Sequence, residues 1–148
     1  MIEYKVKVDD NKTKWFLNGK RHRINGPAVE WANGSKSWWL NGERHRVDGP
    51  AIELADGYKS WSLNGKLHRE DGPAIENSNG DKSWWLNGLR HRIDGPAVEY
   101  ASGDKYWFLN GKEVKEEEVM GKSEKVYTIE ELKNMTLEEI FNIVGRKS

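Results

Sequence analysis

The chain has 148 residues, a length that fits one domain of ordinary size. Its 24 basic and 24 acidic residues cancel, which argues against a broad electrostatic grip on nucleic acid, because such binding relies on an excess of Lys and Arg. The absence of cysteine excludes a disulfide framework and a Cys-ligated zinc site.

The N-terminal residues predict a strand and not a targeting segment. Tyr4, Val6 and Val8 alternate with lysines, the period-two pattern of a half-buried strand. This region lacks the continuous apolar run of a signal peptide, and no stretch of the chain approaches transmembrane length. We therefore expect a soluble, cytoplasmic protein.

A unit of 23 residues then repeats along most of the chain. Each copy opens on a tryptophan and continues through Asn-Gly, His-Arg and Gly-Pro-Ala to a glutamate. The repeated tryptophans are Trp15, Trp38, Trp61, Trp84 and Trp107. A fixed period of this length is typical of repeat architectures whose units stack on their neighbours. We divide the chain into a repeat array, residues 1–111, and a C-terminal segment, residues 112–148.

Each full unit predicts two strands joined by tight turns. In the second unit these are residues 36–40, closed by Asn41-Gly42, and residues 51–54, closed by Asp56-Gly57. Both dipeptides favour hairpin turns because their residues accept positive φ. About ten such strands predict a mainly β fold, an elongated single-sheet array of β-hairpins.

The C-terminal segment predicts short helices. Thr128 and Thr136 each begin a capping box, and Leu137, Ile140, Phe141 and Val144 follow at helical spacing on one face. We interpret the segment as a linker followed by a helical cap over the last strand edge, because an open edge invites aggregation. The alternative is a helix for docking or self-association.

Alternation along the strands assigns side chains to faces. Trp38 and Leu40 are expected on one face and Ser37 and Trp39 on the other. The tryptophan that never varies is expected to be core, interleaved with second-strand residues at the position of Ile52. Aromatic positions that vary between units are predicted to bind a partner: Phe16, Trp31, Trp39, Leu54, Trp85, Tyr100 and Phe108.

The repeated His and Arg residues are interpreted as structural. Units of two strands repeat about 9–10 Å apart, which is too far for equivalent histidines to share one ion with Zn–N bonds of about 2.0–2.1 Å. We predict no metal and no cofactor, and expect each His to hydrogen-bond a backbone carbonyl. Arg46, Arg69 and Arg92 are expected to pair with Asp48, Asp71 and Asp94 of their own loops or with glutamates of a neighbouring unit. The alternative is that the arginine row, Arg23, Arg46, Arg69 and Arg92, forms a loop edge that binds phosphate or acidic groups.

The unit W-x-L-N-G-x-x-H-R-x-D-G-P-A-x-E resembles the MORN repeat over roughly residues 4–111. It departs from that family where Arg follows His and where Gly-Pro-Ala replaces a single glycine. The same form is also similar to repeats in proteins of large viruses and bacteriophages. The resemblance implies a non-catalytic scaffold that binds proteins, with anionic lipid as a further ligand in some arrays.

These observations predict a binding module and not an enzyme, because catalysis needs unlike residues that converge at one place, whereas here every His, Arg and Asp is repeated. The specific role that we expect is a phage-encoded inhibitor of a host protein, such as a defence enzyme, acting in the host cytoplasm. The alternative is peripheral binding of anionic lipid through the arginine row. A protein partner is expected and nucleic acid is not.

Overall fold

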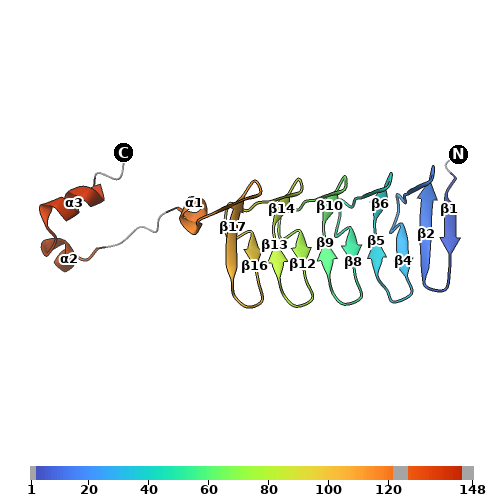
Figure 1. Cartoon of the computed structure of the whole chain (residues 1–148), viewed down its shortest axis with the longest axis horizontal. Helices are drawn as coiled ribbons and strands as arrows, with labels where there is room; N and C mark the ends of the chain where they lie inside the picture. Colours follow the sequence, from blue (N-terminus) through green and yellow to red (C-terminus); the bar gives the residue numbers. More distant parts are fainter. Residues whose placement is uncertain (1–2, 122–126, 145–148) are drawn as a thin grey trace.

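The structure is a computed structural model that describes residues 3–121 and 127–144. Figure 1 shows an elongated row of hairpins that begins with β1 and ends at α1, with α2 and α3 lying beyond it. The predicted mainly β array is confirmed, as are helices at the C-terminal end. None of the helices in the described ranges has the length or apolar character needed to cross a bilayer.

One antiparallel sheet runs the length of the array, and its strands follow the chain order. They are β1 (Lys5–Val8), β2 (Lys12–Leu17), β4 (Val29–Trp31), β5 (Lys36–Ser37), β8 (Ile52–Glu53), β9 (Lys59–Ser60), β12 (Ile75–Glu76), β13 (Lys82–Ser83), β16 (Val98–Glu99), β17 (Lys105–Leu109) and β18 (Lys112–Val114). Each strand pairs with the one before and the one after it, as a meander requires.

A second row of short hairpins lies along one edge of this sheet (Figure 1). Its strands are β3 (Lys20–Arg21), which pairs with β2, and β6 (Trp39–Leu40), β7 (Glu43–Arg44), β10 (Ser62–Leu63), β11 (Lys66–Leu67), β14 (Trp85–Leu86) and β15 (Leu89–Arg90). The two residues after each of the first four Asn-Gly turns form a strand, because the two-residue turn brings them straight back along the preceding strand.

The strand predicted over residues 36–40 is divided at Trp38. Lys36 and Ser37 pair with β4 and β8, whereas Trp39 and Leu40 pair with β7. Between them, the Trp38 amide donates to the Ala51 carbonyl at 2.8 Å and the Trp38 carbonyl accepts from the His45 amide at 3.1 Å. The chain changes partners at this residue, so one continuous strand cannot form.

The two turn types differ. In the Asn-Gly turn both residues have positive φ, 52° at Asn41 and 84° at Gly42, as the hairpin prediction requires. In the Asp-Gly turn only Gly57 does, at 98°. There the Asp56 side chain accepts a hydrogen bond from the Tyr58 amide at 2.9 Å, and this bond stabilises the turn.

The buried centre of the array is thin and made of small residues. The alanine of each Gly-Pro-Ala is fully buried: Ala28, Ala51, Ala74 and Ala97. The repeated tryptophans are only half-buried. Ser37 pairs with both Val29 and Ile52, so these three side chains share a face and Trp38 lies on the opposite one with Ala51. The expectation that the tryptophans interleave with the Ile52 position is therefore wrong, since the register aligns them with the alanines.

The helices are α1 (Glu116–Met120), α2 (Ile129–Lys133) and α3 (Leu137–Val144). Both predicted capping boxes form, with Thr128 and Thr136 exchanging hydrogen bonds with Glu131 and Glu139. The helix that lies against β17 is α1, which was not expected. Figure 1 shows α2 and α3 apart from the array. The side chain of Val144 lies outside the described residues.

Candidate partner-binding face

The seven aromatic and apolar residues predicted to bind a partner share one face of the array. Ser37 pairs with Ile52, so their side chains point the same way, and Trp39 and Leu54 follow two residues later on that face. The same register holds in every unit. We call this surface the aromatic face, and it consists of Phe16, Trp31, Trp39, Leu54, Trp85, Tyr100 and Phe108.

Side chains of the aromatic face are partly held against the sheet. The indole nitrogens of Trp39 and Trp85 donate to the hydroxyls of Ser37 and Ser83, each at 2.7 Å. Leu54 is 39% exposed and Tyr100 is 44% exposed. The indole N–H groups are thus satisfied within the fold, and what remains for a partner is ring surface.

Arginines alternate with these aromatic residues along the second row of hairpins. The Arg21 guanidinium lies 5.0 Å from the Trp39 ring, and Arg21 pairs with Phe16 across its hairpin. The Arg44 guanidinium lies 5.3 Å from the same Trp39 ring, and Arg44 pairs with Trp39 across the next hairpin. In the fourth unit Arg90 lies 5.1 Å from Trp85 and 5.3 Å from Phe108. We call these two runs the arginine–aromatic ladder: Phe16, Arg21, Trp39 and Arg44, then Trp85, Arg90 and Phe108.

The ladder follows from turn geometry. The Asn41-Gly42 turn places Arg44 opposite Trp39. Hydrogen bonds then join successive units, since the Gly42 amide donates to the Arg21 carbonyl at 2.9 Å. The third unit interrupts the ladder because Ser62 and Leu67 occupy the Trp39 and Arg44 positions. Sequence reasoning missed these arginines, although a two-residue turn fixes this register.

No carboxylate within residues 3–121 and 127–144 forms a salt bridge with Arg21, Arg44 or Arg90. The Arg90 Nε atom is buried without a hydrogen-bond partner. Guanidinium groups form strong bidentate hydrogen bonds with carboxylates. The ladder therefore presents cationic groups that have no carboxylate partner among the described residues.

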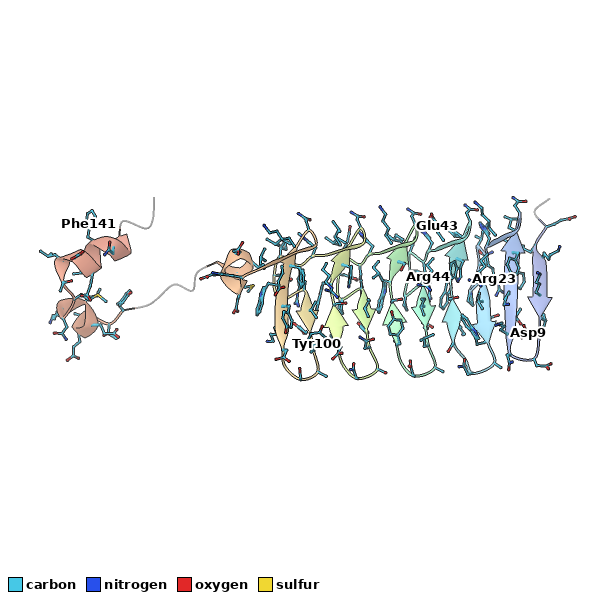
Figure 2. The ribbon with its side chains drawn as sticks, in the orientation of Figure 1. Asp9, Arg23, Glu43, Arg44, Tyr100 and Phe141 are labelled. Atoms are coloured by element: carbon cyan, nitrogen blue, oxygen red, sulfur yellow. The ribbon has the colours of Figure 1, made fainter. Side chains whose placement is uncertain are left out.

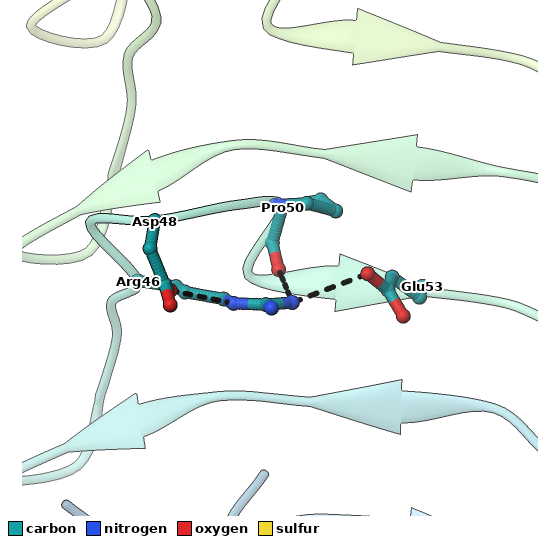
Figure 3. Close-up of polar contacts among 4 residues, drawn as sticks. All are labelled: Arg46, Asp48, Pro50 and Glu53. Atoms are coloured by element: carbon teal, nitrogen blue, oxygen red, sulfur yellow. Dashed lines mark hydrogen bonds and ion pairs between the residues drawn. The ribbon is translucent and has the colours of Figure 1, made fainter. Parts of the chain in front are cut away.

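The arginines of the predicted loop edge are in a different situation, which Figure 3 shows for Arg46. Its Nε donates to Asp48 at 3.0 Å, and its Nη1 donates to the Pro50 carbonyl and to Glu53, each at 3.1 Å. The guanidinium also stacks on Trp38 at 3.8 Å. One side chain therefore ties together the loop, the strand and the tryptophan of its own unit.

Arg69 and Arg92 repeat this arrangement, and Arg23 has a weaker form of it. In the first unit Asn25 replaces the loop aspartate, and the distance from Arg23 to Glu30 is 3.5 Å. The predicted pairing with loop aspartates is confirmed in the other three units. The glutamate partner belongs to the same unit and not to a neighbouring one.

We call the segment from His-Arg to Gly-Pro in each unit its His-Arg loop. Three equivalent grooves lie between successive His-Arg loops, on the face opposite the aromatic face. Their volumes are about 570, 680 and 750 Å³. The largest has Trp61 and Leu63 of one unit at its base and the Arg46 and Arg69 loops as walls. The arginines that line it are already bound within their units, so the grooves offer shape but few unsatisfied polar groups.

The histidines connect one unit to the next. The Nδ1 atom of His45 accepts a hydrogen bond from the Asn64 amide at 3.0 Å, and the other three histidines do the same at 2.9–3.0 Å. The expected bond to a backbone carbonyl is wrong, because the group nearest Nδ1 is the amide at the following Asn-Gly turn. No cluster of three or more potential metal ligands occurs within the described parts of the chain.

Two of the turns that follow the second strand of a unit are joined in a similar way, at Ser35 and at Asp81. The Asp81 carboxylate accepts from the Ala101 amide at 2.7 Å. This bond, together with one from the Asn79 side chain, holds the pKa of Asp81 below the usual range of an aspartate.

No protein-family model matches the chain, and no curated protein matches it.

Proposed function

We propose that this chain is a non-catalytic repeat module that binds a protein partner through the aromatic face. The observation that carries the proposal is the arginine–aromatic ladder, in which guanidinium groups without carboxylate partners alternate with half-buried rings. Trp, Tyr and Arg dominate the energetics of protein interfaces because they combine large apolar area with directional polar groups.

The dimensions of the face suit a protein and not a small molecule. The main sheet has eleven strands along its length, and a spacing of about 4.8 Å gives a surface of roughly 50 Å. A standard interface buries about 800 Å² on each partner, which such a strip can supply.

The resemblance to MORN repeats supports a scaffold role, and the resemblance to phage repeats supports a more specific one. We extend the proposal to an inhibitor that occupies a host protein in the host cytoplasm. The repeated Arg, Asp and Glu residues pair with one another in equivalent places, and each repeated His accepts a hydrogen bond from the next Asn-Gly turn, which supports a role in architecture over catalysis.

Anionic lipid was the alternative ligand, with the Arg23, Arg46, Arg69 and Arg92 row as its site. Three of these guanidinium groups already hold two carboxylates and a carbonyl, and Arg23 holds a carbonyl and one carboxylate. No specific observation favours phosphate binding there, so we propose the protein partner alone.

The test is an affinity capture from host-cell lysate with matched variants. The double variant Trp39→Ser/Trp85→Ser gives two units the residue that the third unit has at Ser62, so the fold is expected to tolerate it. The control is Val47→Ala/Ile93→Ala, which changes side chains that are 83% and 72% exposed in the His-Arg loops.

A partner retained by wild type and control but lost from the double tryptophan variant would support the proposal. Equal capture by all three would refute the aromatic face as the site. Pelleting with anionic vesicles that salt abolishes, without any captured protein, would favour lipid instead.

A further inference from the structure

The α2 and α3 helices carry large apolar side chains with nothing packed on them. Ile129 is 74% exposed, Leu137 is 86% exposed and Phe141 is 76% exposed. Figure 2 shows Phe141 on α3, beyond the end of the array. Fully exposing three such residues on two short helices is costly in water, and clustered exposure of this kind marks an interaction surface.

The same helices are acidic. Residues 127–144 contain four glutamates and one lysine. Glu131 and Glu139 serve their own N-caps, whereas Glu130 and Glu138 lie in the first turns without a salt bridge among the described residues. The segment therefore combines carboxylates with exposed apolar groups.

These properties are the complement of the aromatic face, which combines arginines lacking carboxylates with half-buried rings. We propose that the α2–α3 segment of a second copy of this chain docks on the aromatic face. Glu130 and Glu138 pair with Arg44 and Arg90, and Phe141 packs on the half-buried rings. The inference rests on the proposed function because it uses the same aromatic face. It adds a second copy of this chain as a partner of that face.

A second copy is the occupant because a single chain leaves both surfaces bare. Figure 1 shows α2 and α3 apart from the array to which they belong. Two copies related by a two-fold axis would satisfy both surfaces at once, since each would give its helices to the other, and such reciprocal pairing is the commonest symmetry of homodimers.

Analytical ultracentrifugation of the full chain tests the proposal, with circular dichroism as the check of folding. The wild-type dimer is expected to have a dissociation constant of about 100 µM, because small interfaces belong to weak complexes. Phe141→Asp, which changes an exposed side chain, and the pair Arg44→Glu/Arg90→Glu are each expected to weaken the dimer at least about tenfold, a change that corresponds to one desolvated contact.

The decisive arm mixes two charge-reversed variants. Arg44→Glu/Arg90→Glu and Glu130→Arg/Glu138→Arg are each expected to be monomeric alone. Their mixture restores both docked interfaces as a heterodimer, one with the original charges and one with the charges exchanged, because each variant repels its own kind and attracts the other. A monomeric wild type, or a mixture that stays monomeric, would overturn the proposal.

The outcomes also separate this inference from the proposed function. A monomeric wild type that still captures a protein through Trp39 and Trp85 would refute self-docking and leave the proposed function standing. A dimer that obeys the charge reversals but captures no other protein would uphold self-docking and refute the binding of a host protein.

Discussion

Replacement of Arg69 measures how strongly one side chain holds a unit together. Its guanidinium donates to Asp71 at 2.9 Å and to the Pro73 carbonyl and Glu76 at 3.1 Å, and it stacks on Trp61 at 3.9 Å. The pair with Asp71 is exposed and contributes about 0–1 kcal/mol, and the half-exposed pair with Glu76 about 0.5–1 kcal/mol. The carbonyl bond contributes about 1 kcal/mol and the stacking about 1 kcal/mol.

These contributions predict that Arg69→Ala lowers the free energy of unfolding by about 2–4 kcal/mol, measured by urea titration with tryptophan fluorescence. Arg69→Lys keeps a charge but not the planar fork, so its cost is expected at about 1–2 kcal/mol. Asp71→Asn recreates the first unit, where Asn25 stands at this position, and is expected to cost at most about 1 kcal/mol.

The reasoning would be refuted by either of two results. An Arg69→Lys protein as stable as wild type would mean that the fork geometry contributes nothing. An Asp71→Asn protein as unstable as Arg69→Ala would mean that the exposed pair, and not the carbonyl and the stacking, holds the loop.

Three further predictions concern the contacts that hold the units together and the core. His68→Ala leaves the Asn87 amide without its acceptor and is expected to lower the free energy of unfolding by about 1–2 kcal/mol in the same titration; an unchanged urea midpoint would contradict the assigned bond. Ala74→Val adds volume at a fully buried position and is expected to cost about 1–3 kcal/mol by thermal unfolding, whereas the exposed change Val47→Ala should be neutral. Asp81→Asn tests the sign of a pH effect: because the folded pKa of Asp81 is lowered by the Ala101 amide, the carboxylate stabilises the fold above its unfolded-state pKa, and this stability is lost as the pH falls through the folded pKa. Wild type should therefore exceed Asp81→Asn in urea midpoint at about pH 7 and converge with it in strong acid; a constant difference at all pH values would show that the charge is irrelevant.

Much of the fold could be predicted because its determinants are local. The hairpin at Asn41-Gly42 needs only two residues that accept positive φ, and both have it. Period-two alternation likewise placed Ser37 and Trp39 on one face, and the hydrogen bond from the Trp39 indole to the Ser37 hydroxyl agrees. These features depend on residues a few positions apart, which a sequence displays directly.

Other features depended on contacts between units, which periodicity does not reveal. The acceptor role of His45 requires knowing that the Asn64 amide, nineteen residues away, is its neighbour. The division of the strand at Trp38 requires knowing which groups take its amide and its carbonyl. The α1 helix was missed because it follows Lys115, a residue that seldom caps helices, and its cap is the Glu118 carboxylate reaching back to the Lys115 amide at 3.1 Å.

The histidine bonds also link each unit to the one that follows it. Each unit supplies the acceptor for the turn of the unit that follows, so the last of these bonds runs from His91 to the Asn110 amide. In the fifth unit Val114 stands at the position of the histidine and offers no acceptor. A duplication or loss of 23 residues inside the array would recreate every junction unchanged, so such arrays can lengthen or shorten by whole units during evolution.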